Sequence, residues 1–101
     1  MNFKGKLKDL IAEADSLEWN LWVYSEPYSS LTPETQCIAI DADNSELGTD
    51  DFTPLEVQKC GFQELISIQN LQAVLKNTNN QMAVKAIDYY VKNDAYLAQQ
   101  Q

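Results

Sequence analysis

Apolar residues recur at helical spacing near both ends of the chain. Residues 3–15 place apolar side chains on one face of a helix and charged ones on the other, which predicts an amphipathic helix. The same pattern in residues 68–76 and 81–97 predicts two further helices, separated by an asparagine-rich turn. Suitable N-cap residues precede both of these helices, namely Ser67 before the first and Asn79 or Asn80 before the second.

Between the terminal helices the pattern changes to that of strands. Residues 19–24 are rich in aromatic and branched side chains, and they end before a proline-containing turn. Strand alternation puts Leu21 and Val23 on one face of this segment and Trp22 and Tyr24 on the other. The segment therefore predicts a strand that presents aliphatic side chains to one face of a sheet and aromatic side chains to the other.

Two more strands and a short helix complete the predicted fold. Residues 36–42 contain a near-continuous apolar run, which predicts a central strand covered on both faces. Residues 55–62 predict a short helix or turn that ends near Gly61, and residues 62–67 predict a third strand. We expect one α+β domain over residues 1–101: a small, mainly antiparallel sheet of about three strands, with the N-terminal and the two C-terminal helices packed on it.

Charge adds a second feature to this pattern. The segment from Asp9 to Gln58 contains twelve Asp and Glu residues and no Lys or Arg. The whole chain has fifteen acids and seven bases, so its net charge is −8. Binding to nucleic acid or to an anionic membrane requires clustered cations, and we expect neither. A basic protein partner is expected instead, although acidic composition also serves solubility, and composition alone gives these two interpretations equal weight.

The chain lacks most of the side chains from which catalytic sites are built. It has no His that could activate a Ser or Cys nucleophile, and only three Gly from which to form a phosphate-binding loop. Asp41, Asp43 and Ser45 resemble the start of a calcium-binding loop, but Glu46 stands where that loop needs Gly, and Phe52 where it needs Glu. We therefore expect no enzymatic activity, no metal ion and no cofactor.

The cysteines and the chain ends bear on the compartment. Cys37 and Cys60 match no zinc or redox spacing, and we expect both to be reduced residues of the core. No apolar run follows the basic N-terminus to make a signal peptide, and none approaches the ~20 residues of a membrane span. The sequence therefore predicts a cytoplasmic protein.

A charged interaction surface is the remaining candidate for function. Residues 41–56 hold six carboxylates in sixteen residues, and a basic target would complement them. Trp19, Trp22 and Tyr28 are candidate aromatic anchors of an interface, although core packing is the commoner use of a tryptophan. The predicted partner-binding residues are Asp41, Asp43, Glu46, Asp50, Asp51, Glu56, Trp22 and Tyr28.

The C-terminal third carries a resemblance to a known group of proteins. Residues 65–75 and 87–97, taken with the acidic loop of residues 41–56 and the predicted strand that contains Trp22, resemble small acidic bacterial immunity proteins, including the immunity partners of contact-dependent growth inhibition toxins. The Tyr-Tyr-x-x-Asn-Asp-Ala run at residues 89–95 is the most specific part of the resemblance. The resemblance implies a cytosolic antidote that binds one toxin domain, often a nuclease, as a monomer in a 1:1 complex and blocks its active site.

Two other functions fit the same sequence. An acidic mimic of nucleic acid would inhibit a DNA- or RNA-binding protein, and any DNA would compete with it. A structural subunit would self-associate through Trp19, Trp22 and Tyr28, and its dimer would not respond to salt. We favour an immunity protein directed against a basic toxin, with an RNase as the favoured target, because the acidic stretch lies in a chain without catalytic residues.

Overall fold

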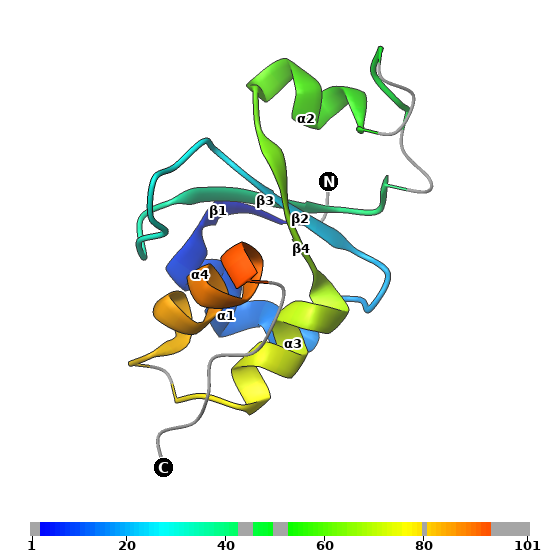
Figure 1. Ribbon diagram of the computed structural model, residues 1–101. Helices are drawn as coiled ribbons and strands as arrows, with labels where there is room; N and C mark the ends of the chain where they lie inside the picture. Colours follow the sequence, from blue (N-terminus) through cyan, green and yellow to red (C-terminus); the bar gives the residue numbers. More distant parts are fainter. Residues whose placement is uncertain (1–2, 43–45, 50–52, 80, 94–101) are drawn as a thin grey trace.

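A computed structural model of the chain describes residues 3–42, 46–49, 53–79 and 81–93 (Figure 1). Within these residues, four strands form one antiparallel sheet in the order β1-β3-β2-β4. The strands are β1 (Phe3–Lys6), β2 (Trp22–Ser25), β3 (Gln36–Ile40) and β4 (Gln63–Ser67). The expected α+β class is confirmed, and the sheet has one strand more than the three that were predicted.

Helices cover the two faces of the sheet unequally (Figure 1). α1 (Leu7–Glu13), α3 (Ile68–Lys76) and α4 (Ala83–Asn93) lie on one face, and α2 (Leu55–Cys60) lies on the other. The larger hydrophobic cluster fills the space between the sheet and the three helices. The smaller cluster consists of Tyr24, Ile38, Ile40 and Val57, with Trp22 and Phe62 packed against it.

The two central strands have the alternation that the sequence predicts. In β2 and the residue before it, Leu21 and Val23 belong to the larger cluster, whereas Trp22 and Tyr24 contact the smaller one. β3 pairs with β1 on one side and with β2 on the other, so it is a central strand, and its residues Cys37 to Ile40 are all buried. The prediction of a strand covered on both faces is therefore confirmed.

The predicted helix over residues 3–15 is wrong in its first third, because Phe3–Lys6 forms the edge strand β1. β1 pairs with β3 with Phe3 opposite Ala39, and the Phe3 side chain packs against the larger cluster. Without β1, the backbone groups along that side of the buried strand β3 would lack hydrogen-bond partners. The helix starts only at Leu7, whose N–H donates to the Thr35 carbonyl at 2.7 Å.

The C-terminal helices follow the predicted pattern closely. α3 has the predicted bounds, and the Ser67 hydroxyl caps it by accepting a hydrogen bond from the Asn70 N–H at 3.2 Å. α4 begins two residues later than predicted, and the Asn79 side chain accepts from the Met82 N–H at 3.0 Å in the turn before it. The end predicted for this helix, residues 94–97, lies outside the described residues.

The short helix α2 also agrees with the sequence. It ends at Cys60, and Gly61 follows in the left-handed region with a φ of 73°. This conformation is available to glycine without steric cost, and the Gly61 N–H there reaches the Gln58 carbonyl at 3.1 Å. Val57 is fully buried in the smaller cluster and attaches α2 to the sheet.

Candidate protein-binding surface

A small hairpin stands between β3 and α2 and carries part of the predicted acidic surface. Leu47 and Pro54 form an isolated antiparallel bridge. Backbone hydrogen bonds close it on both sides, from Gly48 N–H to the Thr53 carbonyl at 2.8 Å and from Leu55 N–H to the Glu46 carbonyl at 2.7 Å. We call residues 46–49 and 53–55 the acidic hairpin. Three predicted binding residues, Asp43, Asp50 and Asp51, lie outside the described residues, and their role stays a prediction.

The side chain of Gln58 attaches the acidic hairpin to α2. Its carboxamide oxygen accepts from the Thr49 N–H at 3.1 Å, and its carboxamide nitrogen lies 3.3 Å from the Thr49 hydroxyl oxygen. Gln58 belongs to a helix that Val57 anchors on the sheet, so residues 46–49 of the hairpin are connected to the core through Thr49 and Gln58. No pattern in the sequence indicates this contact, because a glutamine near a loop can equally face water.

The acidic residues described around the hairpin differ in their exposure. Glu46 and Glu56 are exposed, and within the described part of the chain neither forms an ion pair. Asp41 is half-buried, and its carboxylate accepts from the Asn20 side chain at 3.0 Å. Glu46 and Glu56 therefore present free negative charge to a partner, while Asp41 also connects the end of β3 to the turn before β2.

The long acidic stretch of the sequence does not form one surface. Its first four carboxylates are exposed on α1 and in the residues after it, on the opposite side of the sheet from α2, and they belong to Asp9, Glu13, Asp15 and Glu18. The acidic hairpin and this second acidic surface are therefore separate candidate surfaces on two sides of the sheet. The sequence could not show this separation, because it depends on which face of the sheet each helix covers.

One acid of the stretch is already neutralised within the protein. Glu34 contacts the amines of Lys6 and Lys8 at 2.7 Å and 3.3 Å. The hydrogen bond from Lys6, followed by that from Lys8, holds the pKa of the Glu34 carboxyl below its usual value. The same hydrogen bond from Lys6 to Glu34 raises the pKa of the Lys6 amine. Glu34 therefore fastens the loop before β3 to the junction of β1 and α1.

Tyr28 lies apart from the acidic hairpin. It packs against the larger cluster, on the other side of the sheet from α2. Burial, and after it the charge of Asp88, raises the pKa of the Tyr28 hydroxyl. Asp88 accepts from the Leu31 N–H at 3.4 Å and contacts the Lys92 amine at 3.0 Å, so these residues join the loop after β2 to α4. The structure thus separates Tyr28 from Glu46, Glu56 and Trp22, which are predicted binding residues that it describes on the side of the smaller cluster.

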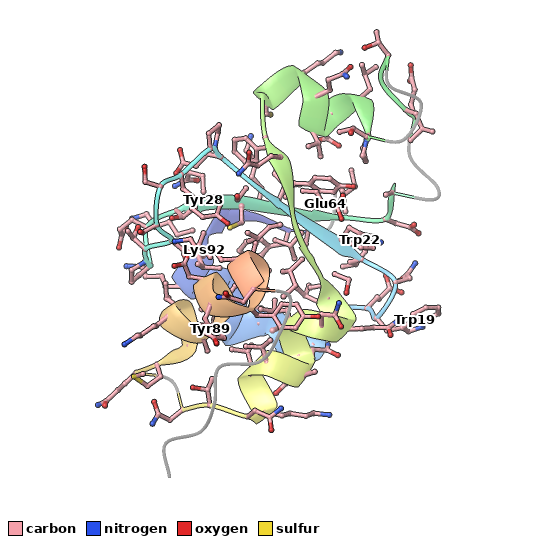
Figure 2. The ribbon with its side chains drawn as sticks, viewed as in Figure 1. Trp19, Trp22, Tyr28, Glu64, Tyr89 and Lys92 are labelled. Atoms are coloured by element: carbon pink, nitrogen blue, oxygen red, sulfur yellow. The ribbon has the colours of Figure 1, made fainter. Side chains whose placement is uncertain are left out.

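The two tryptophans lie near the start of β2 and differ in burial; Figure 2 shows Trp22 on β2 and Trp19 beside the start of α3. Trp22 is half-buried against the smaller cluster, whereas the Trp19 side chain is 69% exposed. Both line a hollow of about 350 Å³, together with Asn20 and the start of α3. Because Asn20 also holds Asp41, this aromatic hollow adjoins the end of β3 from which the acidic loop begins.

The comparison with known proteins identifies a family. Residues 4–99 match the model of a domain of unknown function, DUF7716. The chain belongs to this family. No curated protein and no solved structure matches it. The DUF7716 domain includes the acidic hairpin, α2 and both tryptophans, so the candidate surfaces lie within the part of the chain that the family shares.

Metal-binding groups, thiols and apolar helices are further features of the described part of the DUF7716 domain. No group of three His, Cys, Asp or Glu side chains there is arranged to hold a metal ion. Cys37 is buried, and burial raises the pKa of its thiol to about 12. Cys60 is exposed, so its assignment to the core is wrong. None of the described helices is long and apolar enough to cross a membrane.

Proposed function

We propose that this protein is an immunity protein that binds a basic toxin domain and neutralises it. A nuclease, and an RNase in particular, is the favoured target. The observation that carries the proposal is the pair of exposed carboxylates, Glu46 of the acidic hairpin and Glu56 of α2, on elements that Gln58 and Val57 fix to the core. Within the described residues these carboxylates have no ion-pair partner, so a cationic surface would gain their charge without breaking an existing contact.

The proposed mechanism is occlusion of the substrate groove. A nuclease binds substrate phosphates with Lys and Arg side chains, and carboxylates of the antidote would occupy the same cationic positions. The net charge of −8 would accelerate the encounter, while the hairpin's fixed geometry would select the cognate toxin. We place the protein in the cytoplasm, where an RNase toxin finds its substrate, and as a monomer in a 1:1 complex.

The proposal is tested by protection. The tagged chain is used to isolate its partner from the source bacterium, and the captured protein is then expressed with and without the chain. Restored growth, together with loss of RNA cleavage by the purified toxin in the 1:1 mixture, is the expected result. A captured protein that is not toxic, or a toxin that remains active in the mixture, would contradict the proposal. Release of many proteins by added DNA would favour a nucleic-acid mimic.

A matched pair of variants locates the surface. The double change Glu46→Gln and Glu56→Gln should slow association with the toxin about 3- to 10-fold at low salt and reduce the salt dependence. The control is Asp9→Asn with Glu13→Gln, which removes the same charge from α1 on the other side of the sheet. Equal effects of the two pairs would mean that only net charge matters and that the hairpin is not the binding surface.

A further inference from the structure

A groove runs along the outer edge of β4, beside the tryptophans. It consists of two hollows of about 350 and 230 Å³. Trp22, Ser67 and Asn70 line both hollows, so the two adjoin. Trp19 lies at one end of this edge groove and Tyr90 of α4 at the other.

The backbone of β4 forms one wall of the edge groove. Residues 64–67 of the strand line its smaller hollow. β4 is the last strand of the sheet, and in the described part of the chain only β2 pairs with it. Alternate residues of an edge strand turn their N–H and C=O groups away from the sheet, where an extended peptide can pair with them. The edge groove therefore offers an added strand the outward-facing hydrogen-bonding groups of β4.

A bulge in β4 places a carboxylate beside an aromatic ring in this groove. The register between β2 and β4 shifts after Val23, so that Tyr24 lies opposite Glu64 and the intervening Leu65 turns into the larger cluster. Glu64 thereby shares the sheet face of Tyr24 and Trp22. Figure 2 shows Trp22 and Glu64 near each other on β2 and β4, and both line the smaller hollow. With a continuous register, Glu64 would lie on the opposite face.

The charges around the edge groove favour a cationic occupant. Glu64 is exposed and forms no ion pair with another described residue. Asp41 adjoins the larger hollow through Asn20, and no Lys lines either hollow. Lys92, which follows Val91 of the smaller hollow, is paired with Asp88. A second copy of the chain fits poorly, because two chains of charge −8 repel each other.

We propose that the edge groove binds an extended segment of the partner protein by strand addition to β4. An Arg or Lys of that segment would lie between the Trp22 ring and the Glu64 carboxylate, which together offer a cation–π contact and a charge-assisted hydrogen bond. The inference rests on the proposed function in taking the partner to be basic, and it adds a second contact region to the acidic hairpin. Trp19 would flank the segment at the far end of the groove.

The test uses the full chain labelled with ¹⁵N and two short peptides. The probe is acetyl-Val-Arg-Val-Arg-Val-amide, and the control is the same peptide with Gln in place of Arg. The chain has two tryptophans, so it has two indole N–H signals, which Trp19→Phe assigns. The Arg peptide should shift the Trp22 indole and the amides of β4, and the Gln peptide should bind more weakly by about two- to fivefold.

Charge-matched variants sharpen the test. Glu64→Gln should weaken binding of the Arg peptide about two- to fivefold and leave the Gln peptide unaffected. Glu13→Gln removes an exposed acid from the other side of the sheet and should change neither affinity. Equal binding of both peptides to the unmodified chain, or equal effects of the two variants, would overturn the cation site.

The remaining outcomes separate the edge groove from the proposed function. Shifts confined to the amides of Glu46 and Glu56, or the absence of any shift, would overturn the groove, whereas protection against a toxin could still be observed. Binding in the groove by a chain that protects against no toxin would support the groove and reject the immunity function. Shifts or broadening at the β4 amides that grow with protein concentration alone would show that a second copy covers β4, which also overturns the proposal.

Discussion

Replacing Gly48 with alanine should affect the acidic hairpin only through Gln58. A Cβ atom at position 48 would overlap the carboxamide of Gln58, and the three atoms nearest to it all belong to that carboxamide. Among the three glycines only Gly61 has a left-handed backbone, so alanine meets no backbone strain at position 48. The Gln58 side chain is flexible and can move away, but it then loses both contacts with Thr49.

Two opposing terms set the expected magnitude. Each exposed hydrogen bond contributes at the lower end of a range of about 0.5–1.5 kcal/mol, so the loss of both costs about 1 kcal/mol. Alanine reduces the entropy of the unfolded chain, which stabilises the fold by about 0.4–1 kcal/mol. Gly48→Ala should therefore be close to neutral in the natural chain. In a Gln58→Ala background only the entropy term remains, so the same change should stabilise by about 0.4–1 kcal/mol.

A double-mutant cycle measures this difference. The natural chain, the two single variants and the double variant are unfolded in urea and followed by tryptophan fluorescence, with equal m-values as the condition for comparison. The free energies of unfolding should give a coupling of about 1 kcal/mol between positions 48 and 58. A coupling within about 0.3 kcal/mol of zero would refute the reasoning, because it would mean that Gln58 does not hold the hairpin in solution.

Three further predictions concern other parts of the structure. Cys37 is buried with a thiol pKa of about 12 and Cys60 is exposed, so a thiol reagent at pH 8 should modify Cys60 quickly and Cys37 slowly. Cys60→Ser should abolish the fast reaction, and a fast-reacting thiol in this variant would contradict the burial of Cys37. Ser67→Ala should cost about 1 kcal/mol of unfolding free energy by removing the cap of α3, whereas Ser67→Asp should retain most of it, and equal losses in urea unfolding would exclude capping. The ion pair of Glu34 and Lys6 lowers the pKa of the Glu34 carboxyl and raises the pKa of the Lys6 amine. The stabilisation by this pair is therefore fully present between about pH 4.3 and 10.4. It is lost below this window as Glu34 is protonated, and above it as Lys6 is deprotonated. Glu34→Gln should accordingly lower the urea midpoint at pH 7 and leave it unchanged near pH 2, and a constant difference at both pH values would show that the pair does not titrate as described.

The sequence predicts most elements of this fold because their patterns are local. Ser67 as a cap and the alternation around Trp22 follow from neighbouring residues, and the structure confirms both. The strand β1 was missed because Phe3, Leu7 and Leu10 also fit a helical stripe. The pairing of Phe3–Lys6 with β3 decides between helix and strand, and a contact such as that of Phe3 with Ala39, distant in sequence, leaves no mark in a local pattern.

The candidate surfaces depend more on tertiary structure. Counting charges identifies Glu46 and Glu56, but it does not show that the acids of α1 lie on the other side of the sheet. The approach of Glu64 to Trp22 requires the bulge in β4, which turns Glu64 to the sheet face of Trp22. A bulge is a mismatch between two strands, so neither strand's sequence reveals it alone.

Both edge strands continue into a helix without an intervening loop. β1 ends at Lys6 and α1 begins at Leu7, while β4 ends at Ser67 and α3 begins at Ile68. A slip of either strand by one residue would drag its helix about 3.3 Å along the sheet and pull the helix's buried side chains out of their places in the core. The buried side chains of α1 and α3 thus hold the two edge strands in register. A segment that adds to β4 would pair with a strand whose position is already fixed. The register of the complex would therefore be set by this protein and not by its partner.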